Sequence, residues 1–210
     1  MSHYPPGEEP TSEALRRAAA AAIGALQGAS VPHLLMGGAV TQAFARPRHT
    51  DDVDVFVEPS QARRALDALA RAGFTIEETD PAWLFKAWRG GVLVDVIFRS
   101  SGGIQLDAEM LARGCTRELC GVRALLMSPE DLLVIKAMAA TEDVPHHWYD
   151  ALALVARGDL DWDYVIRRAH VGPSRVLSLV LYAESLGLAV PPRVADALFA
   201  RVHRPRRATG

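Results

Sequence analysis

The stretch LLMGGAVTQAFARPRHTDDVDVFVEP, residues 34–59, decides the fold of this chain. It begins as a short apolar run that ends in two glycines, and it closes as an alternating, valine-rich run that carries Asp52 and Asp54. Because side chains alternate along a strand, residues two apart share a face. Asp52 and Asp54 therefore lie side by side on the strand predicted over residues 51–59. Two adjacent carboxylates repel each other unless a cation lies between them.

The residues on either side of this stretch predict alternating helices and strands. Thr11 can cap a helix that runs to about residue 27, and Pro32 prevents it from continuing. The Gly90-Gly91 pair separates two apolar runs and predicts a β-hairpin. The remaining expectations here are a strand over residues 33–38, helices over 39–45 and 60–73, and hairpin strands over 82–89 and 92–99. The front of the chain is thus expected to form a mixed β-sheet with flanking helices.

From Ser128 onward the sequence predicts helices almost throughout. The segment SPEDLLVIKAMAA, residues 128–140, offers a serine cap, a proline at the first helical position and two acids in the first turn. Helical spacing recurs over residues 146–158, 162–170, 173–187 and 192–202. We therefore expect an α+β fold with three parts, namely a flexible tail at 1–10, an α/β domain at 11–127 and a helical domain at 128–210.

Composition sets broad limits on function. The 210 residues are 50% hydrophobic and carry a net charge of −2, which gives no global electrostatic case for nucleic acid. The absence of a basic leader segment and of a long apolar run predicts a cytoplasmic location without a membrane partner. Lys86 and Lys136 are the only lysines among 23 basic residues.

A third carboxylate lies in the predicted strand VLVDVIF. Alternation places Asp95 on the face opposite Val94 and Val96, and an unpaired buried charge there would cost several kcal/mol. If adjacent strands bring Asp95 to Asp52 and Asp54, the three form a hard-oxygen site suited to Mg²⁺ and substrate phosphates. Two such ions can activate a hydroxyl and stabilise the leaving oxygens of a phosphoryl transfer.

The glycine pair has a matching physical role. Gly37 and Gly38 form a turn without side chains before a predicted helix. Backbone N–H groups at such a turn can approach a phosphate closely, and the helix dipole favours its negative charge. Glycines for phosphates and aspartates for metal would be two halves of one nucleotide site.

These residues resemble a known family. The Gly37-Gly38 pair, the thirteen residues before Asp52-Val53-Asp54 and a third aspartate on a later strand are similar to the DNA polymerase β type nucleotidyltransferase superfamily. Small bacterial members resemble the chain most, namely the minimal, the aminoglycoside and lincosamide, and the AbiEii-type toxin nucleotidyltransferases. The segment RHTDDVDVF, residues 48–56, is similar to the R-x-T-x-D-[IV]-D form common in that group. The resemblance covers about residues 31–155.

The resemblance implies an enzyme that moves an NMP from an NTP to an acceptor hydroxyl and releases pyrophosphate. Asp52 and Asp54 would bind the metals, two Mg²⁺ ions or Mn²⁺ in their place. Asp95 would complete the second metal site and act as the base. Gly37 and Gly38 would hold the triphosphate.

Further contacts are expected from other segments. Arg48 and Thr50, just before the acids, would support the nucleotide. The segment PEDLLVIKAMAATEDVPHHWYDALAL, residues 129–154, is similar to a helix pair of the family in which a lysine precedes an aspartate by about fourteen residues. The resemblance implies that Lys136 contacts the phosphates and that Asp150 supports the site or joins the helical half.

The sequence leaves the acceptor and two other functions open. A tRNA 3′ end, a small molecule such as an aminoglycoside and a protein hydroxyl are all compatible acceptors, although nine arginines and five acidic residues from Val155 onward favour a polyanion such as tRNA. A homodimer or a partner protein is also compatible with the predicted hairpin. One alternative function is a non-catalytic nucleotide- or partner-binding module. The other is an Asp-x-Asp sugar-nucleotide glycosyltransferase, which would not require the glycine turn or a third aspartate.

Overall fold

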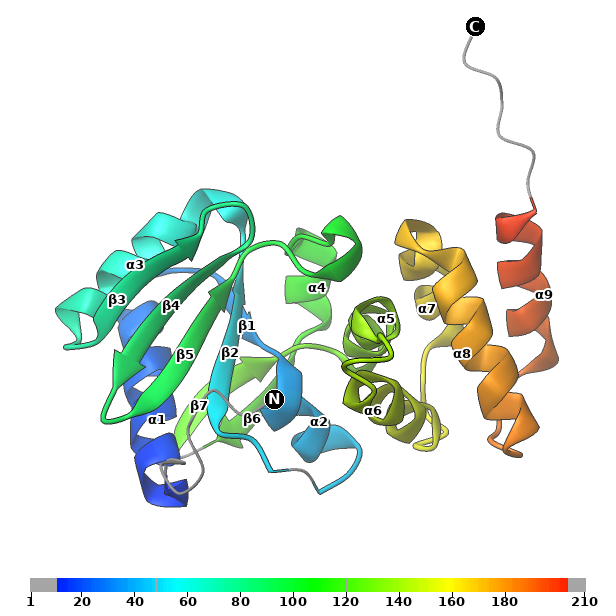
Figure 1. Cartoon of the computed structure of the whole chain (residues 1–210), viewed down its shortest axis with the longest axis horizontal. Helices are drawn as coiled ribbons and strands as arrows, with labels where there is room; N and C mark the ends of the chain where they lie inside the picture. Colours follow the sequence, from blue (N-terminus) through cyan, green and yellow to red (C-terminus); the bar gives the residue numbers. More distant parts are fainter. Residues whose placement is uncertain (1–10, 48, 120, 204–210) are drawn as a thin grey trace, which may run out of the picture. The chain divides into compact units, whose positions relative to one another are not determined.

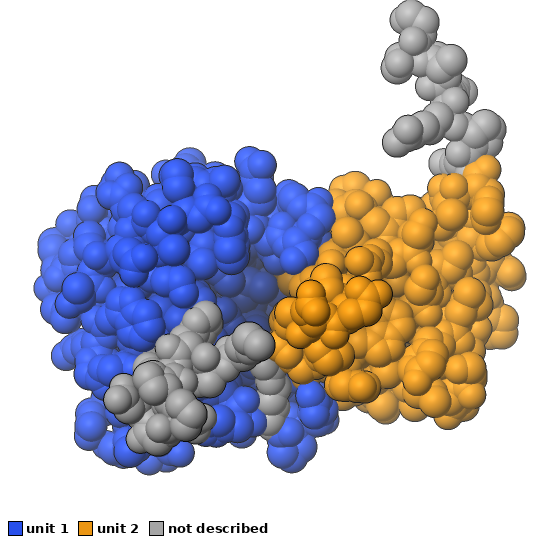
Figure 2. All heavy atoms as spheres, in the orientation of Figure 1, with its two compact units in different colours: residues 1–128 blue, residues 129–210 orange. Residues whose placement is uncertain are grey.

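A computed structural model describes residues 11–47, 49–119 and 121–203. The chain divides into two compact units, unit 1 over residues 1–128 and unit 2 over residues 129–210 (Figure 2). The predicted tail at 1–10 lies outside the described residues, as do Arg48 and residues 204–210. No helix in the described ranges is long and apolar enough to cross a membrane.

Unit 1 is built on a mixed β-sheet (Figure 1). Within the described residues, seven strands lie in the order β3-β4-β5-β2-β1-β7-β6. Their bounds are His33–Leu35 (β1), Asp52–Val57 (β2), Thr75–Asp80 (β3), Leu84–Arg89 (β4), Val92–Ile97 (β5), Cys115–Leu119 (β6) and Val122–Leu126 (β7). Strand β2 pairs in parallel with β5, and β1 pairs in parallel with β7, while the other neighbours are antiparallel. The expected mixed sheet with flanking helices is therefore confirmed.

Helices flank this sheet. Their bounds are Ser12–Gly28 (α1), Gly37–Phe44 (α2), Ala62–Arg71 (α3) and Ala108–Arg113 (α4), with 3₁₀ turns at Pro59–Gln61 (η1) and Ser101–Gly103 (η2). Helix α1 begins as predicted, since the Thr11 hydroxyl accepts a hydrogen bond from the Ala14 N–H at 3.2 Å. Helices α1 and α3 contact each other and the central strands, where Ile23, Leu66 and Val55 are fully buried. This packing buries much of β2 and β5 at the centre of the unit.

Several elements of unit 1 differ from the sequence prediction. Strands β3 and β6 were not predicted, because both are edge strands whose residues are mostly exposed and lack an apolar alternation. Strand β7 and helix α4 were also missed, since each is too short to show a clear period. Helix α3 begins at Ala62 rather than at Ser60, because the 3₁₀ turn η1 precedes it.

Unit 2 is helical, as predicted. Its described elements are Pro129–Ala139 (α5), His146–Val155 (α6), Trp162–Arg168 (α7), Ala169–Val171 (η3), Pro173–Ser185 (α8) and Pro192–Val202 (α9). Helix α5 contacts α6, α7 and α8, and nearly all of its side chains are buried. Three of the buried residues of α5 are charged, namely Glu130, Asp131 and Lys136. The core of unit 2 therefore contains ion pairs as well as apolar contacts.

Candidate active site

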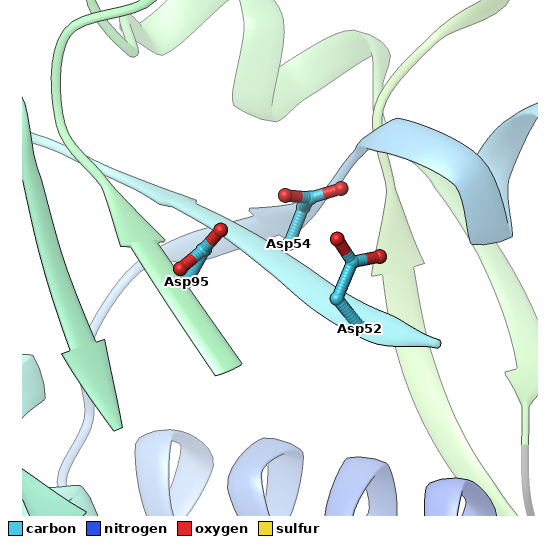
Figure 3. A group of neighbouring side chains, drawn as sticks. All are labelled: Asp52, Asp54 and Asp95. Atoms are coloured by element: carbon cyan, nitrogen blue, oxygen red, sulfur yellow. The ribbon is translucent and has the colours of Figure 1, made fainter. Parts of the chain in front are cut away.

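The two strands at the centre of unit 1 place three carboxylates side by side. Asp52 and Asp54 alternate along β2, and the parallel register pairs Asp54 directly with Asp95 of β5. One carboxylate oxygen from each aspartate lies within 4.8 Å of the others. Figure 3 shows the three side chains projecting from the same side of the two strands. The fold thus turns two positions 41 residues apart, 54 and 95, into neighbours.

This cluster fits a divalent metal ion by its chemistry. Carboxylate oxygens are the ligands that Mg²⁺ and Mn²⁺ prefer, and three carboxylates at this spacing could hold such an ion together. Asp95 is buried at 8% exposure, whereas Asp52 and Asp54 are half-buried. The cluster is therefore anchored in the sheet on one side and open to a ligand on the other.

The glycine turn contacts the same cluster. Helix α2 begins at Gly37, directly after the short strand β1, and the Met36 N–H donates to the Asp54 carbonyl at 3.0 Å. Gly37 has φ +70°, and an added Cβ there would lie 1.7 Å from Oδ2 of Asp54. Only glycine combines this backbone conformation with so close an approach. The turn and the aspartates therefore form one site, and Gly38 follows in the first turn of α2.

The loop before β2 adds a polar contact. The Thr50 hydroxyl donates a hydrogen bond to Oδ1 of Asp52 at 2.7 Å. A carboxylate that accepts such a bond is held in one orientation. Of the two predicted loop contacts, Thr50 thus touches an aspartate, while Arg48 lies outside the described residues.

A cavity of about 280 Å³ opens beside the two aspartates of β2. Its walls come from α1, α2, β1, β2, the end of β6 and the loop before β2, and the lining includes Leu15, Arg16, Gln42 and Asp52. The contribution of α1 was not predicted, because nothing in the local pattern of residues 12–28 indicates that its first turns border a site. The cavity is large enough for a flat heterocycle or a small polar group next to the carboxylates.

Lys86 was also missed as a neighbour of the site. Its Nζ lies 3.8 Å from Oδ1 of Asp95, across the β4–β5 hairpin. The sequence does carry a signal for this contact. Counting outward from the Gly90-Gly91 turn pairs Arg89 with Val92, and three residues further along each strand it pairs Lys86 with Asp95. Register counting across a predicted hairpin would have found this pair.

The two predicted residues of the helical half lie in unit 2. Lys136 of α5 and Asp150 of α6 form an ion pair with Nζ and Oδ2 3.1 Å apart. Both are buried, at 3% and 0% exposure, so Lys136 is not a solvated surface lysine. The Lys136 Nζ also lies 3.2 Å from Nδ1 of His147. The predicted spacing of fourteen residues therefore corresponds to a direct contact between two helices.

A second buried polar cluster lies in the same unit. The Tyr164 hydroxyl donates to Oδ1 of Asp131 at 2.8 Å, and Nε of Arg168 donates to the same oxygen at 2.8 Å. Burial and the neighbouring Asp131 carboxylate raise the pKa of Tyr164 well above its usual range. The hydroxyl therefore stays protonated and serves as a permanent donor to Asp131.

Comparisons with known proteins agree with this architecture. A family model described as "Uncharacterised nucleotidyltransferase" matches residues 10–185. No curated protein matches the chain in sequence. A solved structure of an antigenic nucleotidyltransferase-like protein from Paracoccidioides brasiliensis superposes with a TM-score of 0.52 and 14% identity, over 90% of this chain and 94% of that one. The antibiotic-resistance factor ANT(2'')-Ia superposes with a TM-score of 0.50 and 17% identity, over 81% of this chain and 97% of that one. At 14% and 17% identity, these two matches show that the chain shares its fold with both proteins.

Proposed function

Because the chain belongs to this nucleotidyltransferase family, we propose that it transfers a nucleoside monophosphate from an NTP to an acceptor hydroxyl and releases pyrophosphate. One observation carries the proposal. The parallel pairing of β2 with β5 sets Asp54 opposite Asp95, with Asp52 and the Gly37 turn beside them. Carboxylates that could bind metal and backbone N–H groups that could bind phosphate therefore lie next to each other.

Asp52, Asp54 and Asp95 would hold Mg²⁺, with two ions expected and Mn²⁺ as a substitute. Bound there, the metal would neutralise phosphate charge and increase the acidity of the acceptor hydroxyl. Thr50 keeps the carboxylate of Asp52 in a fixed orientation through its hydrogen bond. Arg48 is proposed as a further phosphate contact.

The first turn of α2 would bind the triphosphate. The N–H groups of Gly37 and Gly38 begin the helix and are not needed for hydrogen bonds within it. They can donate to phosphate oxygens at the positive end of the helix dipole. A side chain at Gly37 would occupy the space of the Asp54 carboxylate, so a glycine is required.

The reaction would be an in-line displacement at the α-phosphorus. The acceptor oxygen forms a bond to this phosphorus while the bond to the bridging oxygen of the β-phosphate breaks, and pyrophosphate leaves. The proton of the acceptor hydroxyl passes to Asp95, or Asp95 orients the hydroxyl for its loss. Asp95 suits this role because its position in the sheet fixes its carboxylate beside Asp54.

The two parts of the chain would have different roles. We assign residues 11–127 to the catalytic domain and residues 128–210 to a helical domain that selects the acceptor. Lys136, which forms an ion pair with Asp150, is proposed as a phosphate contact because of its resemblance to the lysine of the family's helix pair. The arginines from residue 155 onward favour an acceptor such as tRNA over a neutral small molecule. A homodimer is a further proposal.

Isothermal titration of the four NTPs tests the proposal. We expect at least one NTP to bind wild-type protein in Mg²⁺ but not in EDTA, and the Asp52→Ala, Asp54→Ala variant to lose this binding. The variant Asp67→Ala removes an exposed carboxylate from α3 and should bind as wild type does. Binding of UDP-sugars with Mn²⁺ in preference to every NTP would contradict the proposal.

Catalysis is tested separately from binding. With an acceptor that supports pyrophosphate release, Asp95→Asn should retain NTP binding but lose most of the release. The folded state of this variant can be checked by circular dichroism. Release at the wild-type rate would remove Asp95 from the proposed chemistry.

A further inference from the structure

Lys86 extends the row of aspartates across the sheet. Register pairs Lys86 of β4 with Asp95 of β5, and Asp95 in turn with Asp54 of β2. Directly paired residues on adjacent strands point to the same face. An ammonium and two carboxylates therefore lie next to one another on three neighbouring strands.

The surroundings of Lys86 differ from those of an ordinary surface lysine. Its side chain is 16% exposed, and the side chain of Asp95 is 11% exposed. The Nζ–Oδ1 distance of 3.8 Å is too long for a hydrogen bond, but it lies within the range of an ion pair. With little water to screen it, the Lys86 charge acts strongly on the carboxylates.

The residue type is informative as well. Arginine supplies 21 of the 23 basic residues, yet a lysine stands opposite Asp95. An arginine could donate two parallel N–H hydrogen bonds to both oxygens of a carboxylate. A lysine instead carries a compact point charge at the end of a flexible side chain. Lysine can therefore offset the charge of Asp95 without occupying both of its oxygens.

We propose that Lys86 is a positioning residue that sets the metal affinity of the Asp52, Asp54 and Asp95 cluster. Its ammonium balances part of the carboxylate charge when no metal is bound, so that the cluster does not destabilise the sheet. The same charge opposes a cation beside Asp95, which keeps metal binding weak enough to exchange. This inference rests on the proposed function, because it assumes that the cluster binds a divalent ion.

The charge role can be tested on metal-free protein. In EDTA, Lys86→Met keeps the apolar stem, so a loss of stability should come from the loss of the positive charge beside Asp95. We expect Lys86→Met to lower the midpoint of urea unfolding in the wild-type background and to have little effect in the Asp95→Asn background. Equal losses in both backgrounds would show that Lys86 contributes packing alone and would overturn the inference.

Metal affinity gives the second readout. Titration with Mn²⁺ alone should show about ten-fold tighter binding to Lys86→Met than to wild type, since one nearby positive charge is removed. Lys86→Arg should bind Mn²⁺ more weakly than wild type, because arginine takes both oxygens of Asp95. Arg89→Met removes an exposed charge from the same strand and should bind within about two-fold of wild type.

The outcomes separate the two proposals. If wild type binds Mn²⁺ and both Lys86 variants bind it with the wild-type affinity, the inference is overturned while the proposed function stands. If wild type does not bind Mn²⁺ alone, the affinity role of Lys86 fails, and the NTP titration decides separately whether the proposed function stands. Tighter binding to Lys86→Met, weaker binding to Lys86→Arg and coupling to Asp95 in EDTA would support the inference.

Discussion

Gly37 and Asp54 are packed so closely that a Cβ on the glycine would lie 1.7 Å from Oδ2 of the aspartate. Gly37 also has φ +70°, in the left-handed region that side chains disfavour. Two independent requirements, space and backbone conformation, therefore call for glycine at this position. The contact joins the predicted phosphate turn to the predicted metal ligands.

The variant Gly37→Ala should lose metal-dependent NTP binding by more than about ten-fold, because the methyl group must displace the Asp54 carboxylate. Gly73→Ala is the matched control. Gly73 has φ +84°, but a Cβ there has no atom within 4 Å. Both variants should lose about 1 kcal/mol of stability from the backbone, and only Gly37→Ala should lose binding in calorimetric titration. Equal binding by the two would show that the close contact is not needed for the site.

Breaking the Lys136–Asp150 pair should destabilise unit 2 strongly. The two groups are buried 3.1 Å apart, so Lys136→Met leaves Asp150 charged in the interior at a cost of about 3–5 kcal/mol. The double variant Lys136→Met, Asp150→Leu should recover most of this loss. Urea unfolding followed by tryptophan fluorescence measures the free energy of unfolding of the single and the double variant. A cost below about 1 kcal/mol for the single variant would mean that the pair is solvated in solution.

Tyr164→Phe should remove a hydrogen bond from the buried Asp131 carboxylate. We expect a loss of about 1–3 kcal/mol at neutral pH, measured by urea unfolding. Burial and the neighbouring Asp131 carboxylate raise the pKa of Tyr164 in the folded protein above the value of about 10 that tyrosine has in an unfolded chain. The unfolded chain therefore releases the proton first, and the stability contributed by Tyr164 is complete below pH 10 and falls as the pH rises above it. Tyr164→Phe should flatten the alkaline part of the stability profile, and an unchanged alkaline slope would contradict this.

His33 should make the fold sensitive to acid. It is 7% exposed in β1, and burial lowers its pKa below the usual 6.5, although its Nδ1 lies 2.8 Å from the Val31 carbonyl. A lowered histidine pKa means that the unfolded chain binds the proton more readily. The stability that neutral His33 contributes is therefore complete above pH 6.5 and is lost as the pH falls through the pKa of His33 in the folded protein.

The variant His33→Leu tests this assignment. The difference in melting temperature between pH 7.5 and pH 5 should be smaller for His33→Leu than for wild type. His203→Asn, which changes an exposed histidine, should retain the wild-type difference. If the two variants behave alike, another group is responsible for the acid sensitivity.

The sequence alone determined those features that depend on neighbouring residues in the chain. The alternation in residues 51–59 correctly placed Asp52 and Asp54 on one face of a strand, and the Ser128-Pro129 pair correctly predicted that a helix, α5, begins at Pro129. These features follow from strand and helix periodicity, which repeats within a few residues.

The tertiary structure decided which distant residues meet. It set Asp95 opposite Asp54, pressed Gly37 against the same carboxylate, and paired Lys136 with Asp150. It also added the edge strands β3 and β6, whose polar residues carry no periodic signal. Periodicity fixes the face on which a side chain lies, but the register between strands far apart in the chain is selected by the packing of the whole sheet and its helices.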